Sequence, residues 1–171
     1  MTKMGELTPD KLFQGEEFTS AFIRASRVAL GTRQREKLDA LRNAVLNVAA
    51  GMPPDENLQL MFLDALDLLT PWRLNLLDCV ADPMAWSNRH DYPIHNPNTL
   101  DASVIFDAYY RDQLPVEGFV QQLLEDFYGR GLVANNVKPR GQIFPHDEKD
   151  PYPYITKMGR QFLTFVTALT L

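Results

Sequence analysis

Two stretches decide the fold: LLEDFYGRGLV at residues 123–133 and YITKMGRQF at residues 154–162. In the first, apolar residues at helical spacing stop at a Gly-Arg-Gly sequence, and glycine readily takes the left-handed conformation that closes a helix. A short extended candidate follows at residues 132–134. In the second, residues 154–156 are extended and end at Thr156, whose hydroxyl suits the cap of a helix. The two stretches predict a helix, two short strands joined by a long tip, and a last helix.

Further helices are expected ahead of these strands. Thr70-Pro71 opens one that ends near residue 82, a shorter one covers about 101–110, and a third begins at Pro115. Residues 83–100 contain three prolines outside any clear period, so they predict a long loop interrupted by one short turn at residues 84–87.

The resulting order over residues 70–171 is helix, helix, helix, strand, loop, strand, helix, which is that of a winged-helix domain. The stretch ending at Val133 resembles the LxxxGLV end of the third helix in bacterial winged-helix regulators. The stretch from Tyr154 resembles their YxLTxxGxxF exit from the wing. Gly131 permits the tight turn from helix to strand, and Thr156 caps the final helix where the second strand ends.

Residues 1–69 predict a separate helical segment. Thr8-Pro9-Asp10 is a helix-start signature, and apolar residues at helical spacing then run on both sides of Gly31. This pattern fits two helices or one long helix bent near Gly31. After a break at residues 51–55, a strongly apolar helix runs from Glu56. The expected fold class is mainly α.

The predicted organisation is an N-terminal helical segment at 1–69 and a winged-helix domain at 70–171 with a small β-hairpin wing. Residues 36–47, followed by LTPW at residues 69–72, resemble uncharacterised bacterial proteins in which a helical segment precedes a winged-helix-like C-terminal domain. Some of these resemble abortive-infection (phage-defence) proteins. Their motifs are structural, so the resemblance implies no active-site residue.

The composition is that of a folded, acidic chain. Hydrophobic residues make up 45% of it, and 17 Lys and Arg stand against 22 Asp and Glu, a net charge of −5. Nucleic acid and anionic lipid repel such a chain on average, so either partner needs a local basic patch. No apolar run approaches the length of a membrane span, and the first residues lack a secretory signal. We expect a cytoplasmic protein with no membrane span in this chain.

The third helix of the predicted domain is acidic where a DNA-reading helix offers Arg, Lys, Asn or Gln. The face opposite its apolar stripe consists of Glu117, Gly118, Gln121, Gln122, Glu125, Asp126 and Gly129. Carboxylates that face DNA phosphates weaken DNA binding. Each missing cation also removes the free energy that counterion release would contribute. This pattern disfavours nucleic acid and favours a solvent-facing or protein-facing surface.

Basic residues gather elsewhere, in the N-terminal segment. The cluster consists of Arg24, Arg27, Arg33, Arg35, Lys37 and Arg42. It is a candidate contact for nucleic acid, for an anionic partner or for an acidic winged-helix surface; the alternative is a solvated helix face with local ion pairs. Lys138 and Arg140, in the wing, are a second candidate contact. The wing contains about as many acidic as basic residues, so its charge is mixed.

Candidates for chemistry are few. His90-Asp91 and His95 lie on a proline-containing loop with a spacing that matches no common zinc pattern, so surface histidines are the better interpretation. Cys79 lies in an apolar helix, where an inert buried thiol is expected. Phosphate-binding glycine loops, nucleophile elbows and HExxH motifs are absent from the sequence. We therefore predict no catalytic, cofactor-binding or metal-binding residues and no enzymatic activity.

Three hypotheses for function follow. The first is a non-enzymatic module with a protein partner, built on an acidic winged-helix domain. The second is a DNA-binding transcriptional regulator, and the third is a component of a bacterial phage-defence system. Because apolar stripes at residues 16–50 and 57–69 exceed what a small helical segment covers, we also predict a homodimer.

Overall fold

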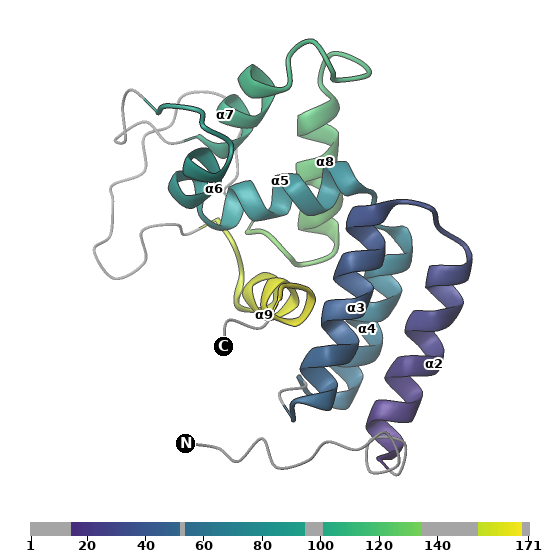
Figure 1. Cartoon of the computed structure of the whole chain (residues 1–171). Helices are drawn as coiled ribbons and strands as arrows, with labels where there is room; N and C mark the ends of the chain where they lie inside the picture. Colours follow the sequence, from purple (N-terminus) through teal and green to yellow (C-terminus); the bar gives the residue numbers. More distant parts are fainter. Residues whose placement is uncertain (1–14, 52–53, 95–100, 135–153, 169–171) are drawn as a thin grey trace. The chain divides into compact units, whose positions relative to one another are not determined.

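The computed structural model describes residues 15–51, 54–94, 101–134 and 154–168 (Figure 1). Within these ranges the chain forms eight α-helices and no β-strand, so the predicted mainly helical fold is confirmed. The helices are α2 (Glu16–Leu30), α3 (Arg35–Ala49), α4 (Glu56–Leu68), α5 (Pro71–Ala81), α6 (Pro83–Arg89), α7 (Ala102–Tyr109), α8 (Phe119–Gly129) and α9 (Lys157–Val166).

Two compact units divide the chain. The first comprises residues 1–71 and 162–171, and the second comprises residues 72–161, so helix α9 begins in the second unit and ends in the first. The domain division at residues 69 and 70 stays a prediction. In the part of the chain that is described, no helix combines the length and apolar character needed to cross a membrane.

In the first unit, α2 packs against both α3 and α4. The chain breaks at residues 31–34, which resolves the alternatives in favour of two helices rather than one bent helix. The Thr32 hydroxyl accepts a hydrogen bond from the Gln34 amide at 3.2 Å within this break. Helix α4 begins where the Asp55 carboxylate accepts the Asn57 amide at 3.0 Å, which is side-chain capping.

The core of the first unit is built around α4 and the end of α9. Phe62 of α4 is buried, with its ring centroid 5.3 Å from that of Phe162 and 5.8 Å from that of Phe165. Edge-on and tilted aromatic pairs of this kind add to the free energy gained by burial alone.

Helix α3 holds the C-terminal end of α9 through two asparagines one turn apart. The buried Asn47 amide donates to the carbonyls of Phe165 at 2.8 Å and Thr167 at 3.1 Å, and the Asn43 amide donates to that of Val166 at 3.1 Å. The last carbonyls of a helix lack partners within it. These side chains therefore satisfy groups that burial would otherwise leave unpaired.

The second unit contains a helix where the sequence predicts a loop. Residues 83–89 form α6, because the Asp82 carboxylate accepts the Ala85 amide at 2.9 Å and Pro83 occupies the first helical turn. Trp86 of α6 is fully buried, so its packing stabilises a helix too short to be stable alone. The predicted long loop at 83–100 is therefore wrong at residues 83–89, where the short turn expected at 84–87 is part of a longer helix.

Helix α8 begins at Phe119 and not at Pro115, as the sequence predicts. Gly118 precedes it with a left-handed φ of 78°, so the chain turns there before the helix starts. The sequence predicts an apolar stripe of Val116, Phe119, Val120, Leu123, Leu124 and Phe127. The last four are buried in α8, whereas Val116 lies before the helix and is 61% exposed.

The predicted wing hairpin is not seen in the described residues. The two extended candidates meet in one antiparallel bridge between Val133 and Ile155, with the Ala134 amide 2.7 Å from the Tyr154 carbonyl. Gly131 turns the chain with a φ of 69°, which only glycine adopts without strain. The rest of the predicted wing, with Lys138 and Arg140, lies outside the described residues.

Thr156 caps α9, as the sequence predicts. Its hydroxyl accepts a hydrogen bond from the Gly159 amide at 2.9 Å and donates to the Gly131 carbonyl at 2.7 Å. One side chain thus fixes the start of the last helix to the turn that ends α8.

Candidate interaction surfaces

Two residues of the basic cluster bind other residues of the first unit. Lys37 is only 7% exposed, and its ammonium donates to the Asp67 carbonyl at the C-terminal end of α4. Arg24 pairs with Asp64, with Nε 2.8 Å from a carboxylate oxygen. These two residues hold α4 against α3 and α2, so the prediction that they contact an anionic partner has no support from their positions.

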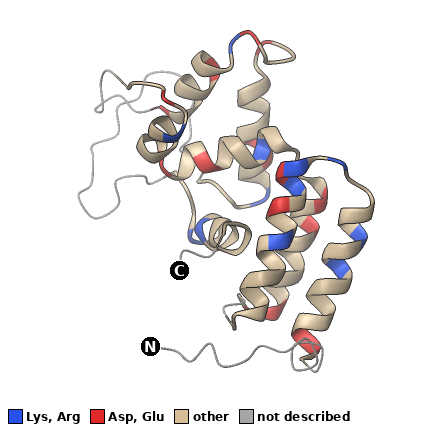
Figure 2. Ribbon diagram, viewed as in Figure 1, with Lys and Arg blue, Asp and Glu red and all other residues tan. Residues whose placement is uncertain are grey.

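Three other members surround the turn between α2 and α3. Arg27 lies in the last turn of α2, Arg33 in the connection and Arg35 at the start of α3, and all three are exposed. Within the described ranges none of them forms an ion pair. In Figure 2 acidic and basic residues are interspersed on α3, whereas on α2 the acidic residues lie at one end and the basic ones in the other half, so the turn is basic without being a continuous stripe.

Arg42, the sixth member, lies in the middle of α3 and is exposed. Its guanidinium is 3.5 Å from the Asn43 side-chain oxygen. The structure therefore does not bring the six residues together as one patch.

The outer face of α8 is less acidic than its sequence suggests. Asp126 is half-buried between two guanidinium groups, 2.9 Å from Arg73 Nε and 3.2 Å from Arg130 Nε. Glu117 precedes the helix. Of the three predicted acids, only Glu125 is an exposed residue of α8 itself.

This face nevertheless offers no cation. Residues 119–129 contain neither Lys nor Arg, and Arg130 is engaged with Asp126. Gln121 donates to Glu125 at 3.1 Å, and Gln122 and Tyr128 are exposed beside them. The surface is polar and weakly acidic, with one aromatic ring, and it lacks the charge that phosphate contacts require.

Large apolar side chains are exposed mainly on the first unit. Of the ten such side chains in the described residues, seven lie on its helices. They are Phe22, Ile23 and Leu30 on α2, Leu38 and Leu46 on α3, and Met61 and Leu68 on α4. Exposed apolar side chains mark a protein-contact surface where they adjoin one another.

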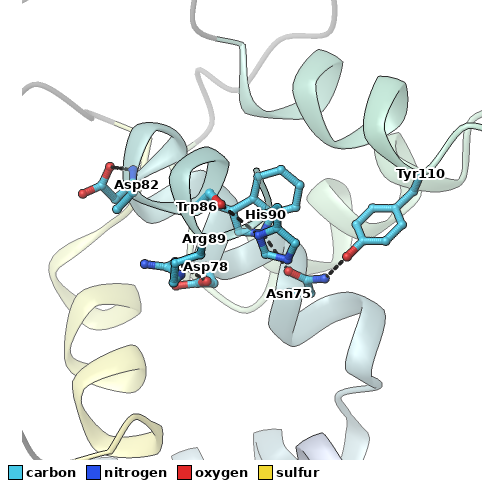
Figure 3. A network of polar contacts seen from close by, with 8 residues as sticks. Asn75, Asp78, Asp82, Trp86, Arg89, His90 and Tyr110 are labelled. Atoms are coloured by element: carbon cyan, nitrogen blue, oxygen red, sulfur yellow. Dashed lines mark hydrogen bonds and ion pairs between the residues drawn. The ribbon is translucent and has the colours of Figure 1, made fainter. Parts of the chain in front are cut away.

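A network of polar contacts in the second unit is structural (Figure 3). Trp86 donates from Nε1 to the Asn75 side-chain oxygen at 2.7 Å, and the Asn75 amide donates to the Tyr110 hydroxyl at 2.6 Å. Burial raises the pKa of Tyr110, and the hydrogen bond from Asn75 opposes that rise. Every group here has a partner, as buried polar groups require.

His90 belongs to the same cluster. Its ring stacks on that of Trp86 at 4.0 Å between centroids, and its Nδ1 lies 2.8 Å from the Trp86 carbonyl oxygen. His95, which the sequence groups with it, lies outside the described residues. Among the residues that are described, no group of three His, Cys, Asp or Glu side chains is placed to hold a metal.

Cys79 is fully buried in α5, with its sulfur 3.7 Å from the Ala102 carbonyl. Burial, and secondarily the charge of Asp78, raises the pKa of the Cys79 thiol. The thiolate is the nucleophilic form of cysteine, so this environment suppresses reactivity.

No protein-family model, curated protein or solved structure matches this chain. The surfaces described above are therefore the basis for a functional proposal.

Proposed function

We propose that this chain is a non-enzymatic protein-interaction module. The observation that carries the proposal is the concentration of exposed apolar side chains on α2, α3 and α4. Exposing Leu, Ile, Phe and Met side chains on adjacent helices is unfavourable in water, and covering them with a partner removes that cost.

We propose further that residues 70–171 are a winged-helix domain with an added helix, α6. Supporting this are the order α5, α7, α8, bridge and α9, and the Gly131 turn. In this scheme α8 is the third helix, the element that reads DNA in winged-helix regulators. Its lack of Lys and Arg argues against that use and for a protein-facing role.

DNA binding by a transcriptional regulator is the alternative function, and one observation favours it. Arg27, Arg33 and Arg35 are exposed and make no ion pair in the described part of the chain. Three such arginines would supply phosphate contacts of the sequence-independent kind. The phage-defence hypothesis has no comparable support in the described residues.

Titration of fluorescently labelled random duplex DNA across a salt series separates the two functions. We expect no saturable binding between about 50 and 200 mM salt, because α8 provides no cation for counterion release. Anisotropy reports binding directly. Binding with a steep negative dependence on salt would contradict the proposal.

Two charge variants serve as controls in that titration. Reversing Arg27, Arg33 and Arg35 to Glu abolishes any binding that the basic turn supplies, whereas Glu125→Gln does not weaken it. Equal behaviour of both variants at low salt indicates that residual binding is not carried by either surface.

A further inference from the structure

The outer side of α2 carries an apolar and charged stripe on which no other described helix packs. We define the α2 outer stripe as Glu16, Ile23, Arg27 and Leu30, which recur at helical spacing on the side opposite the buried Ala21 and Ala25. Ile23 is 47% exposed and Leu30 is 90% exposed. Both values are high for apolar residues of a helix that packs on two neighbours.

Helix α2 is acidic at its N-terminal end and basic toward its C-terminal end. Glu16 and Glu17 form its first turn and Arg27 its last, and Figure 2 shows acid at one end of the helix and base in its other half. The helix dipole favours this order within one chain. It also makes the outer stripe complementary to a copy of itself that runs in the opposite direction.

Arg24 does not take part in this complementarity, because it pairs with Asp64 of α4. Arg27, one turn later, makes no ion pair among the described residues. The two arginines are thus distinguished by the structure: one joins α2 to its own unit, and the other is directed outward.

We propose that α2 is a self-association helix, which pairs antiparallel with α2 of a second copy around a two-fold axis close to Ile23. The inference rests on the proposed protein-interaction function and names its partner as a second copy of this chain. Around such an axis Ile23 meets its equivalent, and Glu16 of each copy comes within reach of Arg27 of the other. A two-fold interface of this kind uses the same patch on both copies.

The small area of the α2 outer stripe determines how strongly we expect the dimer to associate. A helix of 15 residues is about 22 Å long, so one helix pair covers less area than the interfaces of permanent dimers. We therefore expect a reversible dimer with a dissociation constant of roughly micromolar order.

The first test is sedimentation equilibrium of the full chain between about 1 and 100 µM, a range set by that expectation. The wild-type chain should approach twice its monomer mass as concentration rises. Ile23→Asp, which places two carboxylates at the axis, should raise the dissociation constant at least about tenfold. A wild-type chain that stays monomeric throughout the range overturns the inference.

Val104→Asp is the matched control. Val104 is 53% exposed on α7, outside the apolar surface of α2, α3 and α4, so this change adds the same charge to an exposed β-branched residue elsewhere. It should leave dimerisation unchanged. Equal weakening by both substitutions would overturn the assignment to α2.

Charge reversal tests the antiparallel direction. A chain with Glu16→Arg, and a second chain with Arg27→Glu, should each be monomeric alone because like charges then face each other across the axis. Mixed in equal amounts, they should form a heterodimer in which both ends are complementary again. Failure of the mixture to associate, with both chains folded by circular dichroism, overturns the antiparallel pairing.

Single cysteines give an independent check, because the native Cys79 is buried. Under mild oxidation Ile23→Cys should form a disulfide-linked dimer, whereas Leu30→Cys should not, since the two copies of residue 30 would lie about 21 Å apart along the helices. Efficient cross-linking at residue 30 and not at 23 overturns the inference. Loss of the dimer alone leaves the proposed function standing, because the DNA titration tests that function separately.

Discussion

Gly159→Ala is expected to lower the free energy of unfolding by about 3 kcal/mol, the upper end for overpacking of a close-packed site. A Cβ atom at residue 159 would overlap the backbone carbonyl of Leu132 and lie 2.8 Å from Cγ1 of Ile155. Backbone cannot turn aside as a flexible side chain can. The substitution therefore separates α9 from the turn after α8, and urea unfolding followed by circular dichroism measures the loss.

Gly129→Ala is the matched control for this prediction. Gly129 is also helical, but a Cβ atom there meets nothing within 4 Å. Alanine is preferred to glycine inside a helix, so this change should be neutral or should stabilise the protein by up to about 1 kcal/mol. Similar effects of the two substitutions would show that Leu132 does not pack closely on Gly159.

Trp86→Ala is expected to cost about 3–5 kcal/mol of unfolding free energy, the usual range for removing a fully buried large aromatic. Trp86 is fully buried, and its ring lies 5.8 Å from that of Phe106 and 5.2 Å from that of Tyr109. Its removal also leaves the Asn75 side-chain oxygen without its donor. Urea unfolding measures the cost, and near-ultraviolet circular dichroism reports the loss of aromatic packing.

Two variants define the origin of that cost. Trp86→Phe keeps an aromatic ring and removes the N–H donor, so a loss of roughly 1–3 kcal/mol is expected from unpairing and the smaller ring. Tyr128→Ala, at a half-exposed site on α8, should change stability by less than about 1 kcal/mol. A loss below about 1 kcal/mol for Trp86→Ala would contradict the description of α6 as a helix held by its tryptophan.

Helices with long apolar stripes are predictable from sequence because their period is a local property. The cap at Thr156 is confirmed, and so is the apolar stripe of α8 from Val120 to Phe127. Helix α6 is not predicted, because seven residues are too few for a periodic pattern. The one local signal for it is Asp82 before Pro83, a capping residue followed by a proline suited to the first turn.

Partners distant in the chain explain the other differences. Asp126 looks like an exposed acid in sequence, but Arg73, 53 positions away, joins Arg130 in neutralising it. Lys37 looks like an exposed base, and its ammonium is used at the end of α4. Asn47 attracts no attention in sequence, although a polar residue on the inward side of an apolar helix is a signal for a buried hydrogen bond.

The residue types of the candidate surfaces could be predicted from the sequence. Which of those residues are exposed, and which are paired within the fold, could not. Sequence identifies six basic residues near the N-terminus; only the structure separates Arg27, Arg33 and Arg35 from the two that hold α4. The lack of Lys and Arg on α8 is visible in both. That feature leads us to propose that α8 contacts protein and not DNA.

Photo-crosslinking in cells tests this claim most directly. A benzophenone side chain is placed at Tyr128 on α8 in one chain and at Ile23 on α2 in another, and the adducts are treated with nuclease or with protease. We predict protease-sensitive, nuclease-resistant adducts, with that at Ile23 having twice the mass of the chain. A nuclease-sensitive adduct at Tyr128, or no protein adduct at either position, would contradict it.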